Sequence, residues 1–324
     1  MKIHVADLHC DLLLYLASNP ARSAKDPDSR CSIPQLREGN VKLQTMAIFV
    51  ETNKDSLKHG MAQVEVYKKL PHHFPADFMH FDKSIDPLSS QHIVIVPAFE
   101  NCSGFAPDGE PIQKGLSRFQ GLIEEIKPLY VSMTWNLENR FGGGALTPIG
   151  LKEDGKRLLE ALDGTAVALD LSHASDALAY EAIDYIIAKS LKIQLMVSHS
   201  NARVIADYPR NLPDDIAKEI FSRNGLIGLN LFKRLVGEEE ESILKHVAHW
   251  IELGGENHIC LGADFFCVAD IPKTSMTYLL GGEPFFDHYG NASCYPRLLS
   301  FIGKELRISI DKLAHQNFLS FASR

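Results

Sequence analysis

Eight short segments rich in β-branched and apolar residues recur along this chain of 324 residues, and segments with helical periodicity separate them. Several of the eight are apolar on both faces, which is typical of parallel strands that helices cover. We expect strands over residues 3–8, 42–50, 92–99, 129–135, 165–172, 193–198, 226–232 and 258–265. Strands that alternate with helices pair in parallel through right-handed crossovers, and eight of them can close a barrel. The pattern therefore predicts an α/β fold, a (β/α)8 or TIM barrel, with a doubly wound open sheet as the structural alternative.

The length fits a single barrel domain over residues 1–324 with loop insertions, because α/β barrels of this size fold as one unit. After residue 266 the sequence predicts an extended loop and then two C-terminal helices, over about 291–303 and 309–322. The three glycines at 142–144 lack the spacing of a phosphate-binding loop, so we interpret them as a flexible segment near the site.

Charge and cysteine content narrow the class of protein. The formal net charge is −8, so we expect neither a nucleic-acid partner nor an anionic membrane surface, since both need clustered Lys and Arg. Six scattered cysteines without a CxxC pair favour reduced thiols, and the N-terminal segment lacks the apolar stretch of a secretion signal. No segment approaches the roughly 18 apolar residues of a membrane helix. We expect a cytoplasmic protein, and a homodimer is the oligomeric state to test.

Titratable residues follow the predicted strands in a regular way. In α/β barrels, catalytic groups stand just past the C-terminal ends of the strands. Five of the predicted strands end in residue types that bind metal ions: His9 and Asp11, Glu100, His173, His199 and Asp264. We therefore expect these side chains to form one site.

The ligand types indicate which metals would bind. Alternation along a strand sends His9 and Asp11 to the same side, and Asp7 is expected there too, one step deeper, where it could support a ligand. Two carboxylates and three imidazoles suit borderline divalent metals, with Zn²⁺ first and Mn²⁺ or Co²⁺ as alternatives. Five ligand groups exceed what one open catalytic zinc takes. We expect two ions per chain bridged by Glu100, with a metal-bound hydroxide as the nucleophile.

The motifs around these residues are more specific than the residue types alone. They are DLHCDL, PAFEN, GLKEDGKRLLEALDGTAVALDLSHASD, VSHSNAR, YPRNLPDD and LGADF, and they extend from residue 7 to about 265. In this succession the chain resembles the membrane dipeptidase (renal dipeptidase) family of zinc metallopeptidases, within the amidohydrolase-type barrels. The resemblance implies that one metal takes His9, Asp11 and Glu100. It implies that the other takes Glu100, His173 and His199.

The resemblance also implies roles for residues around the metals. Arg210, in YPRNLPDD, would bind the C-terminal carboxylate of the substrate, which suits a planar guanidinium. Asp264 would receive a proton from the attacking water and pass it to the leaving amine. Family members with dipeptidase activity commonly carry a His at the end of the fourth strand that polarises the scissile carbonyl, and Trp135 stands there in this chain. Either Trp135, Asn136 or a metal takes that role in substrate binding, or the preferred substrate differs.

Each of these residues also has a purely structural interpretation. Any one His could be a hydrogen-bonded core residue, Arg210 could pair with Asp214 or Asp215, and Trp135 could be a pocket wall. Four further histidines are expected to be solvated or packing residues and not ligands: His72, His73, His246 and His249.

The leading hypothesis for the function is a zinc-dependent dipeptidase that acts on free dipeptides, with C-terminal D-residues among the candidates. The alternative is an amidohydrolase for N-acyl amino acids, lactams or cyclic amides, which the presence of Trp135 favours. A non-catalytic metal-binding barrel is a third hypothesis, although a chain released from catalysis has no need of all five ligands.

Overall fold

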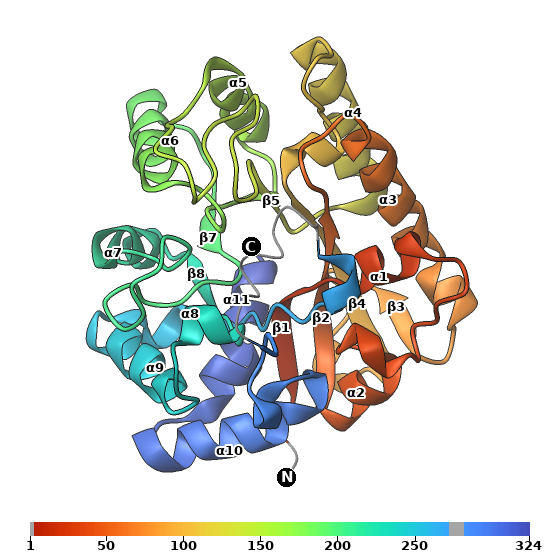
Figure 1. Cartoon of the computed structure of the whole chain (residues 1–324), viewed down its shortest axis with the longest axis vertical. Coiled ribbons are helices and arrows are strands. Elements are labelled where there is room, and N and C mark those ends of the chain that lie inside the picture. Colours follow the sequence, from red (N-terminus) through yellow and green to blue (C-terminus); the bar gives the residue numbers. More distant parts are fainter. Residues whose placement is uncertain (1–2, 272–281) are drawn as a thin grey trace.

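The computed structural model describes residues 3–271 and 282–324, and its strands form one parallel sheet (Figure 1). The described strands are β1 (Val5–Cys10), β2 (Val41–Phe49), β3 (Phe78–His80), β4 (Ile93–Glu100), β5 (Tyr130–Ser132), β6 (Ala168–Asp170), β7 (Leu195–Val197), β8 (Leu226–Leu229) and β9 (Ile259–Leu261). They are ordered β2-β1-β9-β8-β7-β6-β5-β4-β3, and a further pairing of β2 with β4 closes the ring. The predicted barrel is confirmed, and the doubly wound open sheet is wrong.

The strand β3 is the one element of the sheet that the sequence pattern did not predict. It pairs with residues 93–95 of β4, and β5 pairs with residues 99–100 of the same strand. Because β2 occupies the whole opposite edge of β4, β3 and β5 share one edge, and β3 fills its N-terminal half. The closed ring therefore runs β1, β2, β4, β5, β6, β7, β8, β9 and back to β1.

Helices surround the ring and form because their apolar positions recur at helical spacing. The described α-helices are α1 (Leu12–Ser18), α2 (Ile33–Glu38), α3 (Ser56–His73), α4 (Ile112–Ile126), α5 (Glu153–Leu162), α6 (Asp176–Lys189), α7 (Asp214–Ser222), α8 (Lys233–Val236), α9 (Ser242–Glu252), α10 (Tyr295–Leu306) and α11 (Asn317–Ala322). In α6, the Ser175 side chain accepts a hydrogen bond from the Leu178 N–H, and Asp176 lies in the first turn. The helix ends at Ser190, whose left-handed conformation stops propagation.

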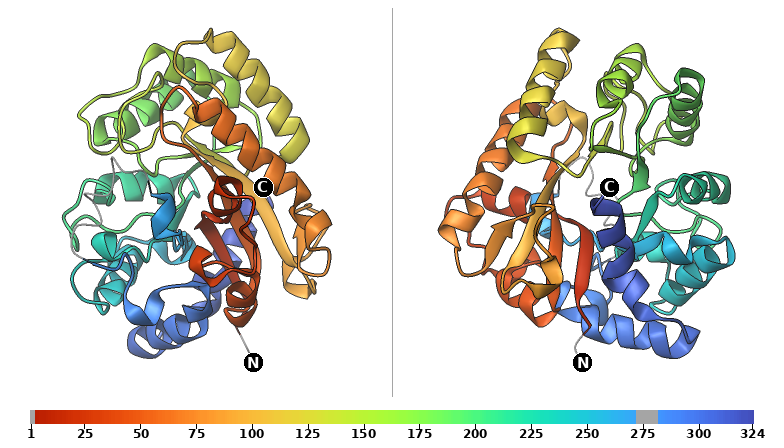
Figure 2. Two further views of the ribbon diagram at one scale, coloured as in Figure 1. Left: turned by 45° about the vertical axis from the view of Figure 1, so that its right-hand side comes forward. Right: turned by 180° about the vertical axis from the view of Figure 1, so that it is seen from behind.

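The two C-terminal helices predicted from the sequence correspond to α10 and to α11 with the π-helical segment before it (Lys312–Gln316). Phe318 and Phe321 of α11 pack against the apolar side chains inside the barrel, among them Leu8 and Met196. Seen from behind, α11 lies near the middle of the ring (Figure 2). The helix closes the N-terminal end of the barrel, which leaves the C-terminal end for polar side chains.

A β-bulge in β1 changes which residues face the barrel interior. Asp7 pairs with Gln44 and Cys10 with Met46, so three steps along β1 match two steps along β2. Ala6 and Leu8 face the interior, and the extra residue turns His9 inward as well, where it contacts Glu100. The expectation that Asp7 lies on the same side as His9 is therefore wrong.

Asp7 instead binds the wall of the barrel. Its carboxylate accepts hydrogen bonds from the backbone N–H groups of His9 (3.0 Å) and Ala263 (2.9 Å). The Gln44 amide (2.7 Å) and the Tyr295 hydroxyl (2.9 Å) also donate to it. Burial raises the pKa of Asp7, and these donors oppose that shift. Asp7 thus fixes the bulge that presents His9, without contact to the imidazole.

Several smaller expectations concern the chain as a whole. All six cysteines are buried and unpaired. No helix in residues 3–271 or 282–324 is both long and apolar enough to cross a membrane.

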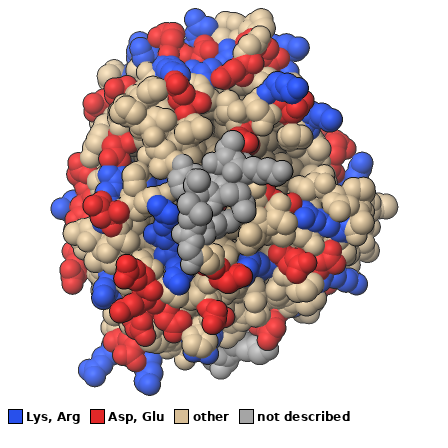
Figure 3. Space-filling model, in the orientation of Figure 1, with Lys and Arg blue, Asp and Glu red and all other residues tan. Residues whose placement is uncertain are grey.

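Part of the loop expected after residue 266, residues 272–281, lies outside the described residues. On the face shown in Figure 3, the described acidic and basic side chains are interspersed.

Candidate metal centre and active site

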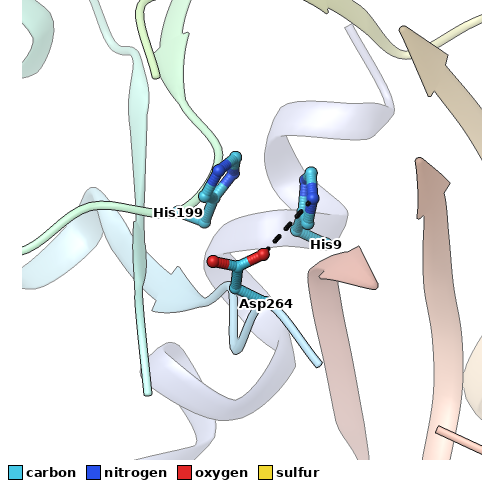
Figure 4. Close-up of side chains that lie close together, drawn as sticks. All are labelled: His9, His199 and Asp264. Atoms are coloured by element: carbon cyan, nitrogen blue, oxygen red, sulfur yellow. Dashed lines mark ion pairs between the residues drawn. The ribbon is translucent and has the colours of Figure 1, made fainter. Parts of the chain in front are cut away.

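The predicted ligands meet at the C-terminal end of the barrel. Glu100 is the last residue of β4, and His9 lies near the end of β1. His173 and Asp264 follow β6 and β9, and both adopt a left-handed backbone conformation with φ of 64°. That conformation costs a non-glycine residue about 1–2 kcal/mol, so the surrounding structure must hold both residues in place. Figure 4 shows His9 of β1 together with His199 and Asp264, which come from the segments after β7 and β9, pointing toward one another.

Glu100 lies between His9 on one side and the pair His173 and His199 on the other. Its Oε2 atom is 3.2 Å from His9 Nε2, and its Oε1 atom is 2.8 Å from His173 Nε2 and 3.8 Å from His199 Nε2. The ligand atoms of His9, Asp11 and Glu100 lie within 4.8 Å of one another, as do those of Glu100, His173 and His199. This is the arrangement of two adjacent cation sites that share one carboxylate.

The polar atoms in this cluster lack the partners that burial demands. His9 Nε2 and Asp11 Oδ1 are buried without a hydrogen-bond partner among the described residues. The Nε2 atoms of His173 and His199 are 2.9 Å apart. Leaving a buried polar group unsatisfied costs about 1–3 kcal/mol. A divalent cation satisfies such atoms at once, so these residues fit a pair of divalent metal ions.

Two of the histidines are oriented by side chains on their Nδ1 side. His9 Nδ1 is 2.7 Å from the Tyr130 hydroxyl, which itself donates to the Leu8 carbonyl (3.1 Å). The hydroxyl proton is thus engaged, and the hydroxyl oxygen accepts from His9 Nδ1–H. His173 Nδ1 donates to Asn136 Oδ1 at 2.9 Å. In the neutral form of each ring the lone pair is therefore on Nε2, which faces the cluster.

The third histidine, His199, is held through a serine. Its Nδ1 atom is 2.6 Å from Ser198 Oγ, which in turn donates to Asp170 Oδ2 at 2.7 Å. Ser132 also donates to this carboxylate, at 2.8 Å. Sequence reasoning missed Tyr130, Ser198 and Asp170, although Ser198 directly precedes a predicted ligand.

Two glycines provide the space for this arrangement. A Cβ atom on Gly228 or Gly262 would lie 1.9 or 2.0 Å from the Ser198 carbonyl oxygen. Only glycine therefore allows β8 and the end of β9 to approach the backbone that carries His199.

Burial and mutual charge set the protonation of the cluster. Although burial acts to lower it, the carboxylate of Glu100 raises the pKa of His9 to about 10. Burial lowers the pKa of His173 to about 3 and that of His199 well below its ordinary value. Burial raises the pKa of Asp264 to about 6, since an aspartate away from water favours its neutral form. Two of the three imidazoles are thus neutral at pH 7, as metal ligation requires.

Arg210 lies in the wall of the same pocket as a buried cation. Its Nη1 donates to Ser200 Oγ (3.1 Å) and its Nη2 to the His199 carbonyl (3.4 Å). Burial lowers the pKa of the guanidinium. No carboxylate in the described part of the chain forms an ion pair with it. The two acidic residues considered as partners bind other side chains: Asp214 contacts His249, and Asp215 contacts Tyr180. The guanidinium is therefore available to an anionic group.

The four other histidines do not take part in the cluster. His72 and His73 are exposed at the end of α3. His246 is fully buried, where its Nδ1 accepts from the Ala202 N–H (3.2 Å) and its Nε2 donates to the Val236 carbonyl (2.9 Å). Together with the His249 contact described above, these positions confirm that all four are solvated or packing residues.

The chain matches the family model "Membrane dipeptidase (Peptidase family M19)" over residues 1–321. It belongs to this family. Among curated relatives of the M19 chain, an uncharacterized dipeptidase of Schizosaccharomyces pombe is 24% identical over 300 residues, which is 82% of this chain and 70% of the relative. An uncharacterized protein of Klebsiella pneumoniae, from the pqqA 5′ region, is 26% identical over 246 residues, 70% of this chain and 80% of the relative.

Solved structures confirm the fold of this M19 chain. A metallopeptidase from Rhodobacter sphaeroides, liganded with a phosphinate mimic of the dipeptide L-Ala-D-Ala, superposes with a TM-score of 0.80 at 20% identity, over 100% of this chain and 99% of the other. A dipeptidase of family M19 gives a TM-score of 0.82 at 19% identity with the same coverage.

In this M19 chain, Trp135 and Asn136 both line the pocket at the centre. The Trp135 ring lies 6.0 Å from the His173 ring and packs edge-on against Phe49 at 5.1 Å, as a wall would. Asn136 also orients His173. The glycines at 142–144 are buried, and Gly144 would bring a Cβ within 1.9 Å of the Trp135 carbonyl oxygen. Gly142 and Gly144 form antiparallel β-bridges with Leu151 and Ala174, so the segment is packed in place and not the flexible segment that the sequence suggested.

Proposed function

We propose that this M19 chain is a binuclear zinc-dependent dipeptidase. The observation that carries the proposal is the pairing of a shared carboxylate with a free cation in one pocket. One carboxylate oxygen of Glu100 faces His9, and the other faces His173. Arg210 lines the same cavity, whose volume is about 110 Å³. His9, Asp11 and Glu100 would hold one ion, and the second would be held by Glu100 with two histidines, His173 and His199.

A bound pair of divalent ions would supply Lewis-acid polarisation of an amide carbonyl and a water nucleophile at neutral pH. The chain itself supplies the proton transfer. Asp264 Oδ1 is 3.7 Å from His9 Nε2, and the Asn230 amide donates to Asp264 Oδ2 at 3.1 Å. Asn230 thus leaves Oδ1 facing the cluster. With a pKa of about 6, Asp264 can accept a proton from the attacking water and deliver it to the leaving nitrogen.

Arg210 supplies selection for a free C-terminus. A guanidinium binds a carboxylate through two parallel hydrogen bonds, and burial strengthens that pairing. A longer peptide would place a neutral amide against the buried cation, so the site favours a dipeptide. The phosphinate mimic of L-Ala-D-Ala in the Rhodobacter sphaeroides metallopeptidase supports this substrate class, including D-residues at the second position.

The test combines metal analysis with turnover. The purified protein is stripped by a chelator, reconstituted with Zn²⁺, Mn²⁺ or Co²⁺, and assayed on L,L- and L,D-dipeptides. We expect about two ions per chain and turnover that follows metal occupancy. His173→Ala should lose metal and turnover, and His72→Ala, altered at an exposed position, should lose neither. Absence of bound metal after reconstitution would refute the centre, and two metals without dipeptide turnover would refute the dipeptidase.

A second candidate is an amidohydrolase acting on N-acyl amino acids, lactams or cyclic amides. The apolar wall of Trp135 and Phe49 beside His173 favours it, because an acyl group lacks the charged amine of a dipeptide. N-acetylated and free forms of the same dipeptide separate the two candidates. Faster hydrolysis of the acylated form would favour the amidohydrolase.

A further inference from the structure

The pocket has an apolar wall on one side of the metal cluster. Phe49 ends β2 and Trp135 follows β5, so the two rings flank Glu100 at the end of β4. Their centroids are 5.1 Å apart with an interplanar angle of 67°, an edge-to-face contact that fixes both rings. Trp135 is half-buried, and it presents its remaining surface to the cavity.

Arg210 comes from the side of the barrel opposite Phe49. It follows β7, which is opposite β2 in the closed ring of β1, β2, β4, β5, β6, β7, β8 and β9. Its loop is anchored to the far side, because the Asn211 amide donates to the Leu235 carbonyl of α8 at 2.8 Å. Glu100, His173 and the aromatic pair line the same pocket as Arg210.

These positions orient a substrate, given the proposed function on which the inference rests. A dipeptide with its carboxylate at Arg210 and its amide over Glu100 extends its first residue toward Trp135 and Phe49. We infer that these two residues determine specificity for the first residue and select an aromatic or bulky aliphatic side chain there. An acidic side chain would lose its hydration against the two rings without gaining a partner from them, because the ring faces carry partial negative charge.

The inference predicts that Trp135 and Phe49 determine the ratio of kcat/KM between dipeptides that differ in their first residue. The metal-loaded protein should hydrolyse Phe-Ala with a kcat/KM at least about 30-fold above that of Ala-Ala, within the range that apolar pockets achieve. Asp-Ala should fall below Phe-Ala by a similar factor. Trp135→Ala and Phe49→Ala should each reduce the Phe-Ala to Ala-Ala ratio to within about threefold, and Trp135→Phe should keep most of it.

The experiment measures kcat/KM for the three dipeptides on the zinc-reconstituted wild type and on each variant, with metal content as a check that the centre is intact. Leu137→Ala is the matched control, because Leu137 is 55% exposed and two residues from Trp135. It should keep the wild-type ratio. A wild type without preference, or a preference that survives both alanine variants, would overturn the inference alone. Absence of turnover on all three dipeptides would overturn the proposed function.

If an alanine variant loses metal, binding of a non-hydrolysable phosphinate replaces turnover as the readout on Trp135→Phe and Phe49→Leu. Analogues with a benzyl or a methyl group at the first position are compared by calorimetry. The wild type should bind the benzyl analogue at least about tenfold more tightly, and Phe49→Leu should narrow that difference. Equal affinities for the wild type would overturn the inference.

Discussion

Replacement of His246 by Gln tests how a buried neutral imidazole stabilises the site. His246 on α9 accepts from the Ala202 N–H and donates to the Val236 carbonyl, so it ties the loop after His199 to α8. Burial lowers the pKa of His246 from 6.5 to about 4. The unfolded chain therefore binds a proton between pH 6.5 and pH 4, whereas the folded chain does not. The contribution to stability is complete above pH 6.5 and falls as the pH decreases toward 4.

The lowered pKa of His246 corresponds to about 3 kcal/mol of folding stability in total. About 2 kcal/mol of this stability is lost between pH 7.5 and pH 5. We expect His246→Gln to cost about 1–3 kcal/mol at pH 7.5, since the Gln amide replaces the donor at Nε2 but leaves the buried Ala202 N–H without the acceptor at Nδ1. The free energy of unfolding of the wild type exceeds that of the variant, and this difference should be about 2 kcal/mol smaller at pH 5 than at pH 7.5. Urea unfolding of the metal-free proteins at both pH values measures this gap, with His72→Gln as the control for an exposed imidazole. A gap that stays constant between the two pH values would refute the reasoning.

Three further predictions concern the centre. Arg210→Ala should reduce kcat/KM for dipeptides roughly 30-fold or more, the effect of about 2–5 kcal/mol for a buried charge pair. For dipeptide amides, Arg210→Ala should reduce kcat/KM less. The control Arg223→Ala removes a surface ion pair at the end of α7 and should leave kcat/KM unchanged for both kinds of substrate. Equal losses on both kinds of substrate in Arg210→Ala would contradict the role of Arg210. Ser198→Ala should weaken metal affinity about 10- to 100-fold in competition with a chelator, and an unchanged affinity would show that the hydrogen bond to His199 is dispensable. Metal uptake at pH 8 should release a proton, because the pKa of His9 is about 10 in the metal-free protein. Affinity should therefore rise with pH, and uptake without proton release in buffers of different ionisation enthalpy would contradict this.

The sequence predicted that these side chains would meet, because their positions follow from the strands. Glu100, His173 and His199 each come directly after an apolar segment, and parallel strands bring such residues to one end of the barrel. The same reasoning placed Asp7 on the wrong side of β1. Strict alternation holds only in a regular strand, and a single extra residue in the ladder inverts it. Nothing in the segment VADLHC marks the bulge.

The partners of the histidines were missed for a different reason. Tyr130 and Asp170 lie within strands, where a sequence offers only a generic core position. Their roles depend on side chains 121 and 28 residues away, through contacts to His9 and Ser198. Such pairs arise from the register between neighbouring strands, which apolar periodicity does not specify. β3 was missed likewise, because a three-residue strand carries too little pattern.

Contacts of the backbone and of each Nδ1 atom hold the side chains of the cluster in place. His173 and Asp264 keep their left-handed conformations through backbone contacts: the His173 carbonyl accepts from the Ala145 N–H at 2.8 Å, and the Asp264 N–H donates to the His9 carbonyl at 3.2 Å. With each Nδ1 engaged, the three imidazoles direct Nε2 inward. An arrangement that leaves buried polar atoms unpaired destabilises the chain by itself. It persists because the rest of the barrel fixes it, as expected for a site whose function requires preorganised ligands.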